Sequence, residues 1–185
     1  MLASFRNLGA ALLLLGSVSA LDAGARENVS ARDGLELATS SAHNWAEDSV
    51  LVYLENDDIV DAQGSAARWG YLFYSAHLDR WRAYSLSDDK VENAGELGFA
   101  FDAPQVEANW IDSDRAYAAA EKAGGRAYRD QNSGALRSML LIRGAFGEDD
   151  PNRTTWTLVY DSAHAPSLFV VVDAENGDVV RAWKG

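Results

Sequence analysis

The sequence contains no cysteine, and only 16 lysine and arginine residues stand against 28 aspartate and glutamate residues, which gives a net charge of −12. The lack of cysteine excludes disulfides, thiolate metal sites and a cysteine nucleophile. The shortage of basic residues argues against nucleic acid as a partner, because phosphate binding requires clustered lysine and arginine. Apolar residues make up 48% of the 185 positions, which is enough to bury a core and to exclude disorder as the main state.

Long hydrophobic runs are also lacking after residue 20. Residues 1–20 have the pattern of a secretory signal peptide. Arg6 supplies a positive charge, Leu8–Gly16 is apolar, and Val18–Ala20 offers small residues for cleavage. This apolar run is shorter than the roughly 20 residues that a membrane-spanning helix needs. We therefore predict an extracytoplasmic protein, periplasmic or secreted, with no membrane span after cleavage. Retention of the segment as an uncleaved anchor is the alternative.

Two segments that lie 87 positions apart resemble each other. Trp69–His77 and Trp156–His164 share the tryptophan, an aromatic residue four positions later, and the triplet Ser-Ala-His. Both alternate as β-strands do. Duplication of one unit explains the match, and chance similarity of two short strands is the alternative. The sequence predicts two units, residues 21–98 and residues 99–185.

Each half is predicted to begin with a helix. Ser30–Asp33 is typical of a capping box, and apolar residues follow it at helical spacing. Asp112–Asp114 caps the second helix, whose alanine stripe is predicted to stop at Gly124-Gly125. Strands are predicted at 50–54, 69–74, 81–86, 137–141, 156–160, 168–172 and 178–183, and 90–109 is predicted to connect the halves, with room for a short extra strand at 97–101.

The second half, over residues 110–183, combines a helix, a strand, Trp-x-Leu-x-Tyr, a turn, and then Leu168–Val172, Asp173–Gly177 and a valine-rich strand. This order resembles the PepSY family. The first half lacks the Asp-Ala-x-x-Gly turn and is a degenerate relative of that unit. The resemblance implies an α+β fold of two tandem PepSY-like units, each with one helix packed on an antiparallel β-sheet. It also implies extracytoplasmic placement and a role in the regulation or inhibition of a peptidase.

His77 and His164 occupy equivalent positions after the two tryptophan strands. A pair of imidazoles from related loops is able to bind a metal or ligand, but turn chemistry inherited through duplication is the interpretation that we favour. We therefore predict no cofactor, no metal and no catalytic residue. The acidic runs at 55–61 and 148–150 lack the spacing of an EF-hand and are predicted to be solvated loops.

No Gly-x-Ser-x-Gly motif is present, and we predict a non-catalytic binding or regulatory protein of the cell envelope with a protein or peptide partner, a peptidase among the candidates. The alternative is a small secreted hydrolase that uses one of the two histidines. The strands 81–86 and 178–183 are predicted sheet edges that pair with an extended peptide. The candidate binding residues are His77, His164, Arg82, Arg181, Trp81 and Trp183.

Overall fold

The computed structural model describes residues 27–145, 150 and 152–185, and the predicted signal peptide at 1–20 lies outside them. Eight strands form one antiparallel sheet in the order β4-β3-β2-β1-β5-β6-β7-β8. The strands are β1 (Val50–Asn56), β2 (Trp69–Ser75), β3 (Arg80–Ser87), β4 (Lys90–Glu96), β5 (Ala135–Arg143), β6 (Thr154–Asp161), β7 (Leu168–Asp173) and β8 (Val179–Lys184). The helices are α1 (Leu35–Trp45), α2 (Ser113–Ala120) and α3 (Arg126–Asn132), and a kinked turn, η3 (Glu121–Gly125), joins α2 to α3. None of the helices in the described ranges is long and apolar enough to cross a bilayer.

The prediction of two tandem units, each a helix on its own antiparallel sheet, is wrong. Strand β1 pairs with β5, with Tyr53 opposite Ile142 and Glu55 opposite Leu140, so the strands of both halves belong to one sheet that makes up much of the described chain. The pairing of β1 with β5 joins residues far apart in sequence, and local periodicity carries no information about it. The division at residues 98 and 99, and its origin by duplication, stay predictions.

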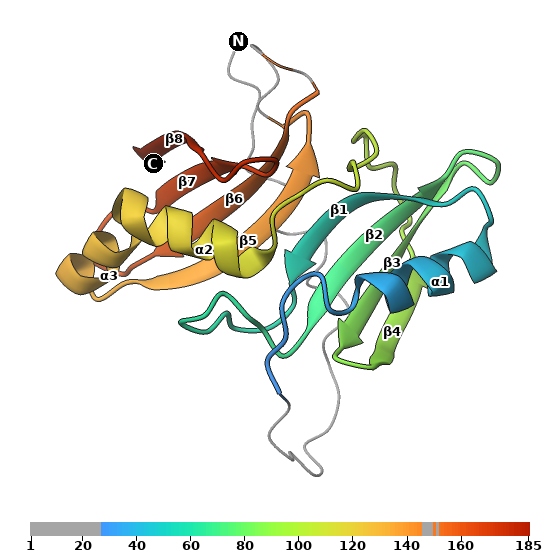
Figure 1. Cartoon of the computed structure of the whole chain (residues 1–185), viewed down its shortest axis with the longest axis horizontal. Helices are drawn as coiled ribbons and strands as arrows, with labels where there is room; N and C mark the ends of the chain where they lie inside the picture. Colours follow the sequence, from blue (N-terminus) through green and yellow to red (C-terminus); the bar gives the residue numbers. More distant parts are fainter. Residues whose placement is uncertain (1–26, 146–149, 151) are drawn as a thin grey trace.

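The core is also continuous across the middle of the sheet. Both α1 and α2 lie on the same side of the sheet (Figure 1). Beneath them the buried rings of Trp69 and Trp156 meet edge to face, with centroids 6.2 Å apart. Each indole also donates a hydrogen bond to a backbone carbonyl, of Val29 and of Ile111 respectively. One apolar cluster therefore includes strands from both sides of the β1–β5 junction.

The opposite face of the sheet is partly covered by the segment 97–103, which follows β4, and the ring of Phe101 meets Tyr53 there at 5.4 Å between centroids. The chain then reaches Val106, which joins the helix-covered core and whose amide donates to the Leu51 carbonyl at 2.8 Å. The predicted extra strand at 97–101 is therefore wrong. The extra strand is β4, which pairs along β3 and forms one edge of the sheet.

The first predicted helix is confirmed, and the second differs from its prediction. The amide and hydroxyl of Ser30 both donate to the Asp33 carboxylate, at 2.7 and 2.8 Å, just before α1. The second helix does not stop at Gly124-Gly125. Gly124 adopts a φ of 138°, which glycine tolerates and other residues rarely adopt, so the chain kinks there and continues as α3.

Candidate functional site

The two candidate histidines lie in exposed turns at opposite ends of the sheet. Three antiparallel steps separate β2 from β6, so these strands run in opposite directions and the turns that follow them are at opposite ends. The His77 amide donates to the Asp48 carboxylate at 2.7 Å, and the His164 amide donates to the Ser162 hydroxyl at 3.0 Å. Both contacts use backbone amides, and the two imidazoles are not brought together.

The candidate residues Trp81 and Arg82 lie in an interior strand, because β4 covers the outer side of β3. The prediction that 81–86 forms a sheet edge is wrong. Trp81 packs on Tyr74, with centroids 4.7 Å apart. The Arg82 guanidinium is 3.9 Å from Glu96 and 5.6 Å from the ring centre of Tyr84. The Leu97 amide donates to the Trp81 carbonyl at 2.9 Å, so the backbone of Trp81 is already paired on the β4 side.

The candidate residues Arg181 and Trp183 lie in β8, which is an edge strand as predicted. Trp183 stacks on Phe169 of β7, with centroids 5.0 Å apart and ring planes 10° apart, and Arg181 lies 4.8 Å from the Trp183 ring centre. Phe169 alternates with Val170, which belongs to the helix-covered core. The stack of Phe169, Trp183 and Arg181 therefore lies on the face of the sheet away from the helices.

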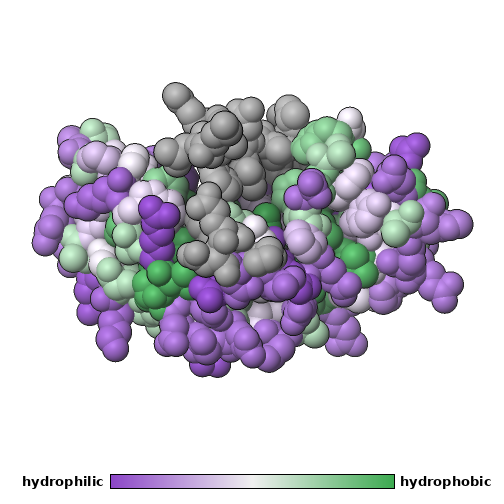
Figure 2. All heavy atoms as spheres, turned by 90° about the horizontal axis from the view of Figure 1, so that it is seen from above, coloured by the Kyte–Doolittle hydropathy of each residue, from purple (hydrophilic) through white to green (hydrophobic). Residues whose placement is uncertain are grey.

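Exposed large apolar side chains are few, and two of them are adjacent in β8. Seen from above, polar residues occupy much of the visible surface (Figure 2). Among the described residues the exposed large apolar side chains are Ile59, Leu78, Phe99, Val179 and Val180. Only the last pair is adjacent in one strand, and that strand is the edge β8. Exposed apolar residues beside an unpaired strand edge are typical of a surface that binds another chain.

A pair of half-buried carboxyl groups, Glu55 and Asp57, lies at the end of β1, where the sequence predicted a solvated loop. The Glu55 carboxylate accepts a hydrogen bond of 2.6 Å from the Tyr53 hydroxyl. Burial raises the pKa of Glu55 to about 7, and burial also raises the pKa of Asp57. Tyr53, Glu55 and Asp57 alternate with the period of a β-strand, so they share one face. This alternation in the sequence could have indicated that the two acids continue the strand.

We predict that the Glu55→Gln variant removes a pH dependence of stability. Glu55 has an ordinary pKa of 4.5 and a folded pKa of about 7, so its contribution is fully present below about pH 4.5 and is lost as the pH rises to 7. Glutamine stays neutral and still accepts from Tyr53. The variant is expected to gain up to about 3 kcal/mol over the wild type between pH 4.5 and pH 7. Urea unfolding at a series of pH values measures this, and a constant difference between the two proteins would contradict it.

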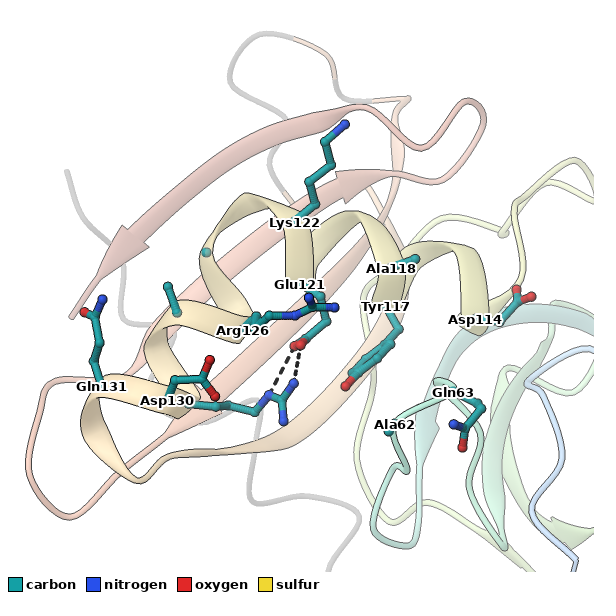
Figure 3. Close-up of a pocket in the computed structure, with 13 residues that line it drawn as sticks. Ala62, Gln63, Asp114, Tyr117, Ala118, Glu121, Lys122, Arg126, Asp130 and Gln131 are labelled. Atoms are coloured by element: carbon teal, nitrogen blue, oxygen red, sulfur yellow. Dashed lines mark hydrogen bonds and ion pairs between the residues drawn. The ribbon is translucent and has the colours of Figure 1, made fainter.

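A pocket of about 820 Å³ lies beside α2 and α3, on the side of the loop at residues 62–63 (Figure 3). Its floor is the Glu121 side chain, which is 7% exposed and forms an ion pair with Arg129 across the kink. The Tyr117 ring and the guanidinium of Arg126 are also in its lining. The sequence analysis identified only a stripe of alanine residues in this helix. Tyr117 and Glu121 are four residues apart, which places them on one helical face.

Burial and the Glu121 carboxylate shift the pKa of several groups next to the pocket. Both raise the pKa of Tyr117 and of Tyr160. The pKa of Arg129 is raised by its hydrogen bond to Glu121. Groups of three or more histidine or acidic residues placed to hold a metal are not found in the described part of the chain.

Comparisons with known proteins identify a similar fold but do not assign the chain to a family. No family model and no curated protein sequence matches this chain. The fold is similar to a crystal structure from Clostridium difficile 630 described as a "putative lipoprotein", with 13% identity and a TM-score of 0.54, over 82% of this chain and 92% of that one. At this identity the likeness shows the fold alone. The PepSY resemblance accordingly stays a prediction.

Proposed function

We propose that this protein is an exported, non-catalytic binding protein of the cell envelope, and that it takes an extended segment of a partner protein along the outer edge of β8. The observation that carries the proposal is the position of β8 at the end of the sheet, with Val179 and Val180 exposed. The description of the similar solved structure as a putative lipoprotein supports an envelope location. The signal-peptide pattern and the PepSY resemblance support it as well, and the resemblance makes a peptidase one candidate partner.

The backbone of β8 offers alternate hydrogen-bonding groups to such a segment. The Gly185 amide donates to the Ser167 carbonyl on the β7 side at 3.0 Å. Because antiparallel pairs alternate, Trp183 also points its amide and carbonyl toward β7, whereas Ala182 and Lys184 point theirs outward. An added strand therefore finds free donors and acceptors at Ala182 and Lys184.

The charge of the chain favours a basic partner. The net charge of −12 repels acidic proteins and attracts basic ones during encounter. The hydrolase alternative needs only one histidine, and His77 lies near the Ser75–Asp48 pair, but there Ser75 donates directly to Asp48 and His77 contacts Asp48 through its backbone amide.

The Ala182→Pro variant is expected to weaken peptide binding by at least about tenfold, because proline removes an outward amide without breaking the β7 pairing. Peptides selected from a random display library against the wild-type protein serve as the probes, and calorimetry measures their affinity. The matched control is Ala182→Val, which keeps the amide and should bind as the wild type does. Equal affinity of the proline and valine variants, or a library that yields no binder, would refute the proposal.

A further inference from the structure

The pocket beside α2 and α3 contains a cation that the described chain leaves without a counter-ion. Arg129 is occupied by Glu121. Arg126, one turn earlier on α3, is exposed and has neither an ion pair nor a hydrogen bond from its guanidinium among the described residues. The chain has only 16 basic residues against 28 acidic ones. Lys122, also in the lining, is a second exposed cation without an ion pair among the described residues, so the pocket offers two such cations to an anionic group.

A second donor accompanies this guanidinium. The Tyr117 side chain lines the same pocket, and its hydroxyl points into it (Figure 3). This hydroxyl makes no hydrogen bond within the described residues, and it is near enough to Arg126 and Arg129 for both charges to affect its pKa. Arg126 and Tyr117 come from the two sides of the kink at η3, so the kink brings the two donors to one pocket.

The remaining lining residues restrict the kind of anion. Asp114, Glu121 and Asp130 also border the pocket and balance the charges of Lys122, Arg126 and Arg129, so the lining has no net positive charge that would favour a doubly charged phosphate over a singly charged anion. A carboxylate has a single charge, and its planar shape matches the two parallel N–H groups of a guanidinium. Small residues in the lining, Ala62, Ala118 and Ala127, leave space for a short attached chain.

We propose that this pocket binds an organic carboxylate, which accepts hydrogen bonds from the Arg126 guanidinium and the Tyr117 hydroxyl. The carboxylate belongs either to a free small acid or to the C-terminus of a peptide. An ammonium or amide group of the same ligand meets Asp114 or Asp130 at the border of the pocket. This site is separate from the β8 edge, because no residue of β8 is in its lining, and the two proposals fail independently.

The test uses the mature chain with three probes: tri-alanine, tri-alanine amide and inorganic phosphate. Amide chemical shifts of α2 and α3 in NMR titrations give the affinities. Tri-alanine is expected to bind at millimolar concentration, and its amide and phosphate are expected to bind at least about tenfold more weakly. A further titration with acetate separates the two sources. Comparable binding of acetate assigns the site to small acids, and much weaker binding assigns it to peptide C-termini.

The Arg126→Gln variant is expected to lower the affinity for tri-alanine by about tenfold or more, and Tyr117→Phe is expected to lower it by a smaller factor. The matched control is Arg115→Gln, which removes the same charge from an exposed position of α2 outside the pocket lining. The control should bind as the wild type does, and thermal melting confirms that all variants are folded. Equal loss in Arg126→Gln and Arg115→Gln, equal binding of tri-alanine and its amide, or no binding of any carboxylate would overturn the proposal.

Discussion

Replacement of Trp156 by alanine is expected to lower the free energy of unfolding by about 4 kcal/mol. Its side chain is fully buried, and its indole donates a hydrogen bond of 2.8 Å to the Ile111 carbonyl. The ring also meets Trp69 and Trp110 edge to face, at 6.2 and 5.9 Å between centroids. The substitution removes these aromatic contacts, leaves the Ile111 carbonyl without a donor, and opens a large cavity in the middle of the core.

The loss of stability is expected to affect the strands on both sides of the β1–β5 junction, because Trp69 belongs to β2 and Trp156 to β6. Calorimetry should show one unfolding transition in the wild type and in the variant, and hydrogen exchange should accelerate in β2 and β3 as well as in β6 and β7. The control is Trp45→Ala, which truncates a half-buried tryptophan on α1 and should cost much less. Two separate transitions, or unchanged exchange in β2 and β3, would show that the halves fold as independent units.

Several strands were predictable because their side chains alternate or are apolar throughout. The Trp69 and Trp156 strands show the period of two, and Leu168–Val172 is continuously apolar. Strand β4 escaped prediction because its sequence, Lys-Val-Glu-Asn-Ala-Gly-Glu, is rich in residues that are depleted in strands. It is a strand because β3 offers it a partner. The kink at Gly124 was read as a helix stop, since Gly-Gly is a common C-terminal signal.

The candidate binding residues were predictable only in part. The exposed edge at β8 follows from its position as the last strand, and Arg181 and Trp183 lie there as expected. The edge assigned to Trp81 failed because an edge depends on which strand lies next to it, and β4 was not foreseen. The pocket at Arg126 depends on the angle between α2 and α3, and residue patterns do not fix this angle. A half-buried carboxyl group such as that of Glu55 cannot be told from an acidic loop residue until the strand is known to include it.

At the kink between α2 and α3, the addition of one methyl group to Gly125 is expected to be severely destabilising. A Cβ atom at Gly125 would overlap the Cζ and Oη atoms of the Tyr160 ring and would lie 2.8 Å from the Glu121 carboxylate. The backbone of Gly125 is helical, with φ −56° and ψ −47°, so alanine is otherwise favoured there by about 1 kcal/mol. Steric overlap outweighs this preference because Tyr160 is fully buried and has no space in which to move.

The Gly125→Ala variant is therefore expected to lose about 3 kcal/mol of unfolding free energy in urea denaturation. The control is Gly98→Ala, whose added Cβ would meet nothing within 4 Å and should change stability little. A double-mutant cycle with Tyr160→Leu isolates the cause, because leucine lacks the two overlapping ring atoms. Adding Gly125→Ala to the Tyr160→Leu variant should then cost almost nothing. If the losses of unfolding free energy in the two single variants simply add in the double variant, the close approach of Gly125 to Tyr160 is not the reason that glycine is required at position 125.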